Sequence, residues 1–203
     1  MKNEKETRTK LLASAKKEFL TKGYMQASLR SICQNAGVTT GALYFFFQDK
    51  EDLFGALVEE PLNKMYEVLN QHFSEEILQV DKGAIDEEDY SSDIMASQQI
   101  VHYMYQYYDE FQLILTKSQG SRFEQCIERF VEISEKHYGY LAERIARQKK
   151  CPSVDPYMIH WLSHMQVDAF VHMLTHEKSE EEAMKHIEII MKFLITGWFE
   201  LFS

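Results

Sequence analysis

Hydrophobic positions recur along the first fifty residues with the period of amphipathic helices, with polar positions between them. An apolar residue recurs every three or four positions between charged ones, which predicts a first helix that Gly23 ends. Its apolar positions are Leu11, Leu12, Ala15 and Phe19. Ser28 is placed to cap a second, shorter helix. The apolar face of that helix consists of Leu29, Ile32, Cys33 and Ala36.

A third short helix follows after a sharp turn. Gly37 ends the second helix, because glycine readily adopts the left-handed conformation that such a reversal needs. Val38 is expected to lie between the two helices, and Thr39 to cap the third. The inward-facing residues expected in the third helix are Leu43, Tyr44 and Phe47. Two short helices joined in this way have the geometry of a helix-turn-helix, whose second helix can enter a DNA major groove.

The rest of the chain also has helical periodicity. A fourth helix is predicted to start near Lys50, and Pro61 is expected to kink or break it. Residues 81–93 are rich in acids and predict a connector, with 91–93 capping the next helix. Helices then continue to the end, with breaks near 118–121, 151–156 and 176–180. No strand alternation is present, so we predict an all-α fold with a headpiece at 1–50 and a larger helical domain at 51–203.

The net charge of the chain is negative, which is unfavourable for binding DNA, but the charges are unevenly distributed along the sequence. The 203-residue chain carries −10, but residues 1–50 hold nine Lys and Arg against four acids, and the remaining residues hold 13 against 28. This asymmetry indicates that one end meets a polyanion, although a chance fluctuation of the surface explains it equally well. No apolar run is long enough to span a membrane, and no secretory signal is seen. The three cysteines are far apart, which favours a reducing cytoplasm.

The N-terminal motifs resemble those of a known family. The matching residues are Gly23-Tyr24, Ser28-Leu29-Arg30-Ser31-Ile32, Ala36-Gly37-Val38-Thr39-Thr40-Gly41-Ala42-Leu43-Tyr44, Phe47 and Lys50-Glu51-Asp52-Leu53. This run resembles the headpiece of TetR/AcrR-family transcriptional regulators over roughly 45 residues without a gap. The remainder is similar only in length and helical character.

The resemblance implies a role for each headpiece residue. It places Arg30 where some members reach a guanine, Thr39 as the cap of the recognition helix, and Lys50 as the end of a phosphate clamp. The residues implied to contact phosphate are Ser28, Thr39, Tyr44 and Lys50, and those implied to face the groove are Thr40, Gly41, Ala42, Phe45 and Phe46. Hydroxyl groups and a lysine near helix N-termini suit phosphate binding.

Phe45 and Phe46 depart from the family, which often carries polar or amphipathic aromatic residues at these positions. A phenylalanine cannot hydrogen-bond a base edge, but it can contact a thymine methyl or a sugar. Alternatively, one of the two rings packs beneath the headpiece. Sequence readout is then expected to depend on Arg30, methyl contacts and DNA shape.

The last two helices are apolar on more than one side, which indicates a partner, and a twofold dimer is the commonest form. A thick monomer core is the alternative. The resemblance implies that these helices build a four-helix dimer interface. The residues predicted for it are Trp161, Asp168, His172, Ile187, Met191, Leu194 and Trp198.

An effector pocket is predicted among the aromatic residues of the middle of the chain. Its expected lining is Tyr103, Tyr107, Phe111, Phe130, Trp161 and Met165, which suits a largely apolar small molecule, although such residues are more often plain core. His160 with His164, and His172 with His176, have a spacing that can hold a metal ion, but a third ligand is missing. We therefore predict no metal and no cofactor.

The sequence thus predicts a ligand-responsive repressor that binds a palindromic DNA operator as a homodimer, in the cytoplasm and without a membrane partner. A regulator controlled by a protein partner is the alternative. An all-α enzyme would need a nucleophile with a base or a metal centre, and no such set is seen, so we predict no enzyme activity.

Overall fold

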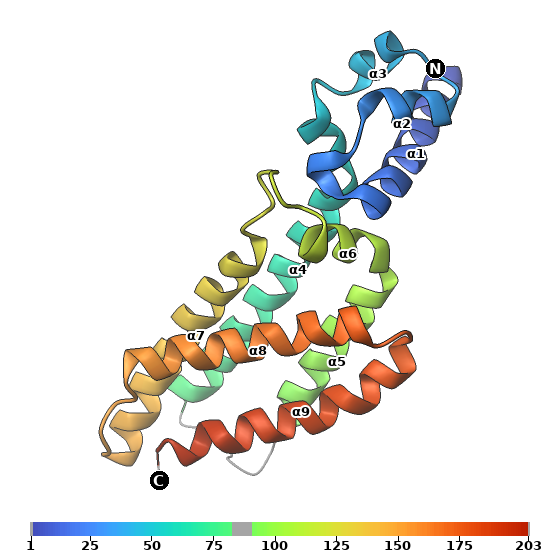
Figure 1. The fold of residues 1–203 in the computed structure, drawn as a ribbon. Coiled ribbons are helices and arrows are strands. Elements are labelled where there is room, and N and C mark those ends of the chain that lie inside the picture. The colour runs from blue at the N-terminus through green and yellow to red at the C-terminus, as the bar shows by residue number, and fades with distance from the viewer. Residues whose placement is uncertain (1, 83–90, 203) are drawn as a thin grey trace. The chain divides into compact units, whose positions relative to one another are not determined.

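The computed structural model describes residues 2–82 and 91–202, and within these ranges the chain forms nine helices and no strand (Figure 1). The all-α prediction is confirmed. The helices are α1 (Lys2–Gln26), α2 (Leu29–Ala36), α3 (Thr40–Phe46), α4 (Lys50–Asp81), α5 (Ser91–Gln106), α6 (Tyr108–Thr116), α7 (Cys126–Lys149), α8 (Pro156–His176) and α9 (Glu180–Glu200). Most of the acidic connector expected at 81–93 lies outside the described residues.

The chain divides into two compact units. The first runs to Lys64 and also includes Tyr107–Cys126, and the second comprises Met65–Gln106 and the chain from Ile127 onward. These units do not coincide with the boundary predicted at residue 50, since the first unit takes in the first half of α4 and all of α6. The division into domains at residue 50 stays a prediction. Helix α4 contributes residues to both units.

The first unit is built around aromatic side chains of α1 and α4. The ring of Phe19 meets that of Phe54 edge to face at 5.0 Å, and both side chains are fully buried. Phe123 packs on the other side of Phe54, at 5.7 Å between ring centroids. The amide of Tyr24 also donates to the carbonyl of Lys117, so the end of α1 is tied to the segment after α6. These contacts fix the frame on which α2 and α3 are held.

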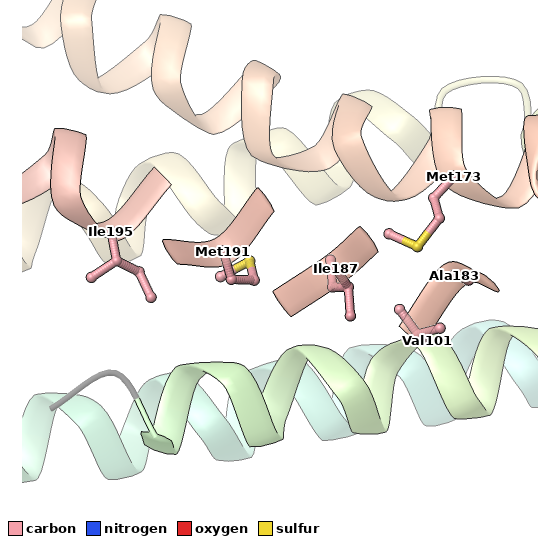
Figure 2. Packing of buried hydrophobic residues seen from close by; sticks show 6 residues of the cluster. All are labelled: Val101, Met173, Ala183, Ile187, Met191 and Ile195. Atoms are coloured by element: carbon pink, nitrogen blue, oxygen red, sulfur yellow. The ribbon is translucent and has the colours of Figure 1, made fainter. Parts of the chain in front are cut away.

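The second unit buries one stripe of α9 against α5 and α8. Ala183, Ile187, Met191 and Ile195 follow each other along α9 and form one cluster with Val101 of α5 and Met173 of α8 (Figure 2). This spacing of three to four residues is that of a helix with one buried face. Helices α8 and α9 run antiparallel in Figure 1, joined by the turn at residues 177–179.

Helix α4 corrects one expectation. Of the kink or break predicted at Pro61, the break is wrong, since α4 continues from Lys50 to Asp81 with Pro61 inside it, while the kink stays a prediction. A proline in a helix interior costs about 3 kcal/mol or more, because it removes a hydrogen bond and clashes with the preceding turn. The buried side chains of Val58 and Leu62 hold the helix on both sides of it, and this packing outweighs the local cost. The breaks expected near 118–121, 151–156 and 176–180 are confirmed.

Within the described ranges, no helix is both long enough and apolar enough to cross a membrane.

Candidate nucleic-acid interface

The turn between α2 and α3 is fixed by backbone hydrogen bonds. Gly37 has φ +68° and ψ +32°, the left-handed conformation that ends a helix. Its amide donates to the carbonyl of Gln34, and the amide of Val38 donates to that of Cys33. This pair of bonds is the Schellman motif, which satisfies carbonyls that the helix end leaves open. The angle between α2 and α3 is therefore set locally, as the sequence predicts.

Helix α3 presents one face to the core and the other to solvent. Thr39 caps it, because its hydroxyl oxygen accepts from the amide of Ala42 at 3.2 Å. Leu43 and Phe47 are buried as predicted. The inward placement of Tyr44 is wrong, since 55% of this residue is exposed. Thr40 and Gly41 are also exposed and Ala42 is half-buried, so the outer face of α3 carries the positions that the resemblance implies for DNA.

Phe45 and Phe46 occupy different environments. Phe45 is 72% exposed, the most exposed of the large apolar side chains in the described chain. Phe46 is half-buried, with its ring edge-to-face on Phe45 at 4.9 Å and near Phe47 at 6.4 Å. Phe46 therefore supports Phe45 from the side of the core. Phe45 is the more exposed of the two rings, and its contact with DNA stays a prediction.

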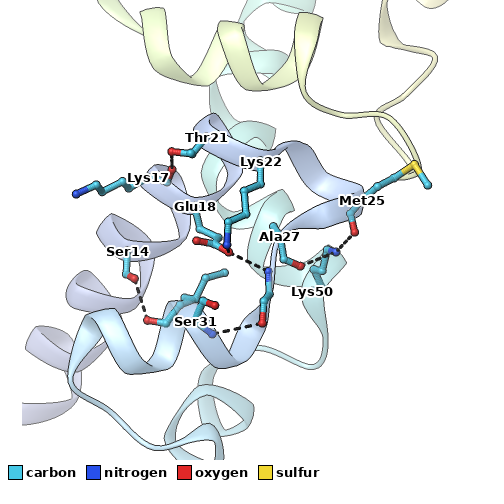
Figure 3. Close-up of polar contacts among 11 residues, drawn as sticks. Ser14, Lys17, Glu18, Thr21, Lys22, Met25, Ala27, Ser31 and Lys50 are labelled. Atoms are coloured by element: carbon cyan, nitrogen blue, oxygen red, sulfur yellow. Dashed lines mark hydrogen bonds and ion pairs between the residues drawn. The ribbon is translucent and has the colours of Figure 1, made fainter.

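Polar contacts hold α1 against α2 (Figure 3). The hydroxyl of Ser14 donates to the carbonyl of Ile32 at 2.8 Å. Glu18 is 7% exposed and accepts from the ammonium of Lys22 at 2.7 Å and from the amide of Ser28 at 3.2 Å. The hydrogen bond from Lys22 lowers the pKa of Glu18, and burial, which acts in the opposite direction, does not outweigh it. A buried carboxylate thus fixes the residue that caps α2.

Ser28 and Arg30 have the positions expected of DNA contacts. The hydroxyl oxygen of Ser28 accepts from the amide of Ser31 at 3.4 Å. Capping uses this oxygen as an acceptor, so the O–H of Ser28 can still donate to a phosphate. Arg30, two residues into α2, is exposed, and its guanidinium offers the fork of donors that can read a guanine. The DNA roles of both residues stay predictions.

Lys50 has a structural role that the sequence does not reveal. Its ammonium donates to the carbonyls of Met25 at 3.1 Å and Ala27 at 3.0 Å, and lies 4.7 Å from the centre of the Tyr24 ring (Figure 3). Burial lowers the pKa of Lys50. The side chain therefore ties the start of α4 to the chain between α1 and α2. Its third N–H is the one that a phosphate clamp would use.

The residues predicted for a dimer interface divide into two groups. Ile187 and Met191 are 0% and 5% exposed and belong to the core of the second unit, so their assignment to a partner is wrong. Trp198 packs on Tyr138 and Phe202 of the same chain, each at 5.2–5.3 Å between ring centroids. The rest lie toward the surface: Trp161, Asp168 and His172 are exposed and Leu194 is half-buried.

The outward faces of α8 and α9 carry apolar residues that the sequence reading did not select for the interface. Ile189 and Phe193 of α9 are 68% and 69% exposed, and Tyr157 of α8 is 70% exposed. Periodicity shows that α9 has two apolar stripes, but it cannot tell which of them the chain itself covers.

The predicted pocket residues do not share one unit. Tyr107 and Phe111 belong to the first unit, where Phe111 is 1% exposed, and the other four belong to the second. Phe130 packs on Tyr66 at 4.9 Å, and Trp161 is 47% exposed. Tyr103 and Met165 are half-buried.

Among residues 2–82 and 91–202, neither histidine pair belongs to a group of three closely spaced metal-ligand side chains. The rings of His160 and His164 meet at 4.7 Å, and His160 pairs with Glu135 at 3.1 Å. His172 and His176 stack on each other at 3.9 Å. A different set of residues comes together in the second unit, namely His72, Glu76, Asp93 and His137. Sequence reasoning missed it, and its only local signal is the four-residue spacing of His72 and Glu76.

Comparison with known proteins agrees with this headpiece. Residues 11–57 match the family model "Bacterial regulatory proteins, tetR family". The repressor BepR of Brucella suis biovar 1 (strain 1330) is 45% identical over 53 residues, which cover 26% of this chain and 25% of BepR. The chain spans between 25% and 44% of the length of the curated relatives that it matches.

Solved structures resemble the chain over nearly its whole length. NalD, the secondary repressor of the MexAB-OprM multidrug efflux pump in Pseudomonas aeruginosa, superposes with a TM-score of 0.59 at 21% identity, covering 94% of this chain and 96% of NalD. A gamma-butyrolactone receptor (ArpA-like protein) does so with a TM-score of 0.59 at 18% identity, covering 98% and 96%. Identities this low establish the shared fold alone.

The fold consists of a helix-turn-helix headpiece followed by a helical C-terminal region. Residues 11–57 thus form a headpiece of the kind found in the tetR family of bacterial regulatory proteins.

Proposed function

We propose that this protein is a ligand-responsive repressor that binds a palindromic operator as a homodimer and is released by a small molecule. The observation that carries the proposal is the outer face of α3. This helix is capped by Thr39, anchored by the buried Leu43, and exposes Tyr44 and Phe45 to solvent. A rigid short helix with an exposed aromatic face is suited to insertion in a major groove.

Charge supports the same surface. The first fifty residues carry a net charge of +5 in a chain whose net charge is −10. Positive charge at the headpiece attracts the phosphate backbone, and the negative remainder limits binding by any other face. Arg30 supplies base readout, while Ser28, Thr39, Tyr44 and Lys50 supply phosphate contacts. Thr40, Gly41, Ala42 and Phe45 form the surface that meets the groove.

The homodimer is proposed from the exposed apolar faces of α8 and α9. Tyr157, Trp161, Ile189 and Phe193 are 47–70% exposed. Large apolar side chains gathered on the two last helices indicate a covered surface. A second copy of the chain is the natural cover, because a palindromic site is read by two headpieces related by a twofold axis.

The effector is proposed to bind in the second unit and to act through α4. Its largely apolar character is inferred from the aromatic interior of that unit, where Tyr138 contacts Phe73 and Trp198 and accepts a hydrogen bond from Gln166 at 2.6 Å. Because α4 is one continuous helix with residues in both units, a shift of its second half also displaces its first half. An effector that favours one position of α4 then biases DNA binding.

Selection of bound DNA from a random pool, followed by titrations at several salt concentrations, tests the DNA proposal. We expect enrichment of a palindrome whose half-sites lie about 10 base pairs, or a multiple of this, apart, and an affinity that falls steeply with salt. Arg30→Ala should cost about 1–3 kcal/mol at a single base pair and relax preference there. Arg147→Ala, an exposed arginine of α7, is the matched control and should leave affinity unchanged.

Failure to enrich any sequence, or an affinity independent of salt, would contradict the DNA proposal.

Mass spectrometry of the purified protein under native conditions tests the proposal of a small-molecule effector. A small molecule that copurifies and weakens DNA binding supports a ligand-responsive repressor. A protein that copurifies and has this effect instead supports the alternative, a regulator controlled by a protein partner.

A further inference from the structure

Four side chains with metal-binding chemistry meet inside the second unit. His72 and Glu76 lie one turn apart on α4, Asp93 lies in the first turn of α5, and His137 lies on α7. Nε2 of His72 is 3.6 Å from Oδ1 of Asp93 and 4.0 Å from Oε2 of Glu76. Nε2 of His137 is 2.7 Å from the same oxygen of Glu76. Three helices that are distant in sequence thus direct these groups to one point.

The spacing of three of these groups suits coordination of one ion. Ligand atoms of His72, Glu76 and Asp93 lie within 4.8 Å of one another, and among residues 2–82 and 91–202 they are the one group of three such ligands that the structure shows. Ligand atoms bound about 2.1 Å from a tetrahedral zinc ion are separated by about 3.4 Å. The separations of 3.6 and 4.0 Å from His72 therefore need only small side-chain adjustments.

The charge of the cluster favours a cation. The side chains of Glu76 and Asp93 are 26% and 29% exposed, and that of His72 is 18% exposed. In the described part of the chain, the basic partners of these two carboxylates are histidines, with no lysine or arginine among them. In this part of the chain, the two partly buried carboxylates therefore have no permanently charged partner of the kind that ordinarily stabilises such groups. A divalent ion would supply that charge.

His137 acts behind these ligands. Its side chain is 3% exposed, and its ring stacks on Phe73 with centroids 3.9 Å apart and planes 6° from parallel. Nδ1 of His137 is buried without a hydrogen-bond partner in the described structure. A ring in this position holds its proton on Nε2, where it is donated to Glu76. Such outer hydrogen bonds orient the carboxylates that bind metals.

We infer that His72, Glu76 and Asp93 bind a divalent transition-metal ion, with His137 as a positioning residue that holds Glu76. One imidazole and two carboxylates form a mixed nitrogen and oxygen set, which suits zinc and its first-row neighbours better than calcium or a thiolate-bound metal. Water completes the coordination sphere. The bound ion would join α4 to α5 directly, and the hydrogen bond of His137 to Glu76 would link α7 to the site.

Binding can be measured on the full chain without DNA, which separates this inference from the proposed repressor function. The protein is freed of metal with a chelator, which is then removed, and is titrated with Zn²⁺ by calorimetry and with Co²⁺ by visible absorption. We expect a single ion per chain. Glu76→Gln and Asp93→Asn, which preserve side-chain shape, should each abolish stoichiometric binding. His137→Asn should weaken Zn²⁺ binding about 10–100-fold, as the loss of an outer hydrogen bond does.

The matched control replaces one of the two histidine pairs of α8, as His160→Ala with His164→Ala, and should bind Zn²⁺ as the wild type does. Circular dichroism confirms that each variant is folded, and Asp93→Asn decides the outcome if another variant is not. Absence of stoichiometric binding by the wild type would overturn the inference. It would also be overturned if the control lost the ion or if Glu76→Gln and Asp93→Asn both kept it.

Discussion

Phe45 offers the most direct test of how the headpiece binds DNA. A phenylalanine side chain buries about 200 Å² when it is fully covered. Since 72% of Phe45 is exposed in the free protein, about 140 Å² is available to a groove. At about 25 cal/mol per Å², complete burial would stabilise the complex by about 3.5 kcal/mol. Alanine keeps part of this contact and a groove covers only part of the ring, so Phe45→Ala should cost about 1.5–2 kcal/mol.

This cost corresponds to a roughly 10- to 30-fold loss of operator affinity. The stability of the free protein should change little, because the ring contacts solvent and the edge of Phe46. Fluorescence anisotropy with labelled operator measures the first quantity, and thermal unfolding measures the second. Met95→Ala is the matched control, because Met95 is 60% exposed but lies on α5. Wild-type affinity in Phe45→Ala would refute the placement of this ring in the groove.

Three further predictions concern stability and assembly. Glu18→Gln should lower the free energy of unfolding by about 1–2 kcal/mol at pH 7. Because the folded state lowers the pKa of Glu18 below its ordinary 4.5, this difference is present above about pH 4.5 and should vanish in denaturant titrations at lower pH. A difference that is independent of pH would contradict the role of the charge. Lys50→Met keeps the aliphatic part of the side chain near Tyr24 but leaves the carbonyls of Met25 and Ala27 without their donor, so the free energy of unfolding in urea should fall by about 1–3 kcal/mol. An unchanged unfolding midpoint would show that these hydrogen bonds do not contribute to stability. Phe193→Asp should halve the mass measured by light scattering while Leu78→Asp, exposed on α4, should not, and a variant that remains dimeric would move the interface away from α9.

The headpiece could be predicted from sequence because its structure is determined locally. Ser28, Gly37 and Thr39 are caps whose effect depends on neighbouring residues, and the structure places each of them as predicted. Tyr44 was misplaced because a seven-residue helix is too short for periodicity to separate the core position of Leu43 from the next one.

The second unit was less predictable because its contacts are distant in sequence. Ile187 and Met191 have the apolar character of an interface, and only the position of α5 shows that the chain covers them itself. The cluster around Glu76 includes Asp93 and His137, which are 17 and 61 positions away from it in sequence, so no local pattern connects them. Pro61 was misjudged for the same reason, since packing around Val58 and Leu62 overrides its local preference.

Helix α9 carries its core-forming residues and its exposed apolar residues on two different stripes. Its inward stripe, which includes Ala183 and Ile187, completes the core of one chain, whereas Ile189 and Phe193 point away from that core. Substitutions on the outward stripe can therefore accumulate without a loss of folding. In the proposed homodimer, recognition between copies could therefore diverge among related regulators while the fold is conserved.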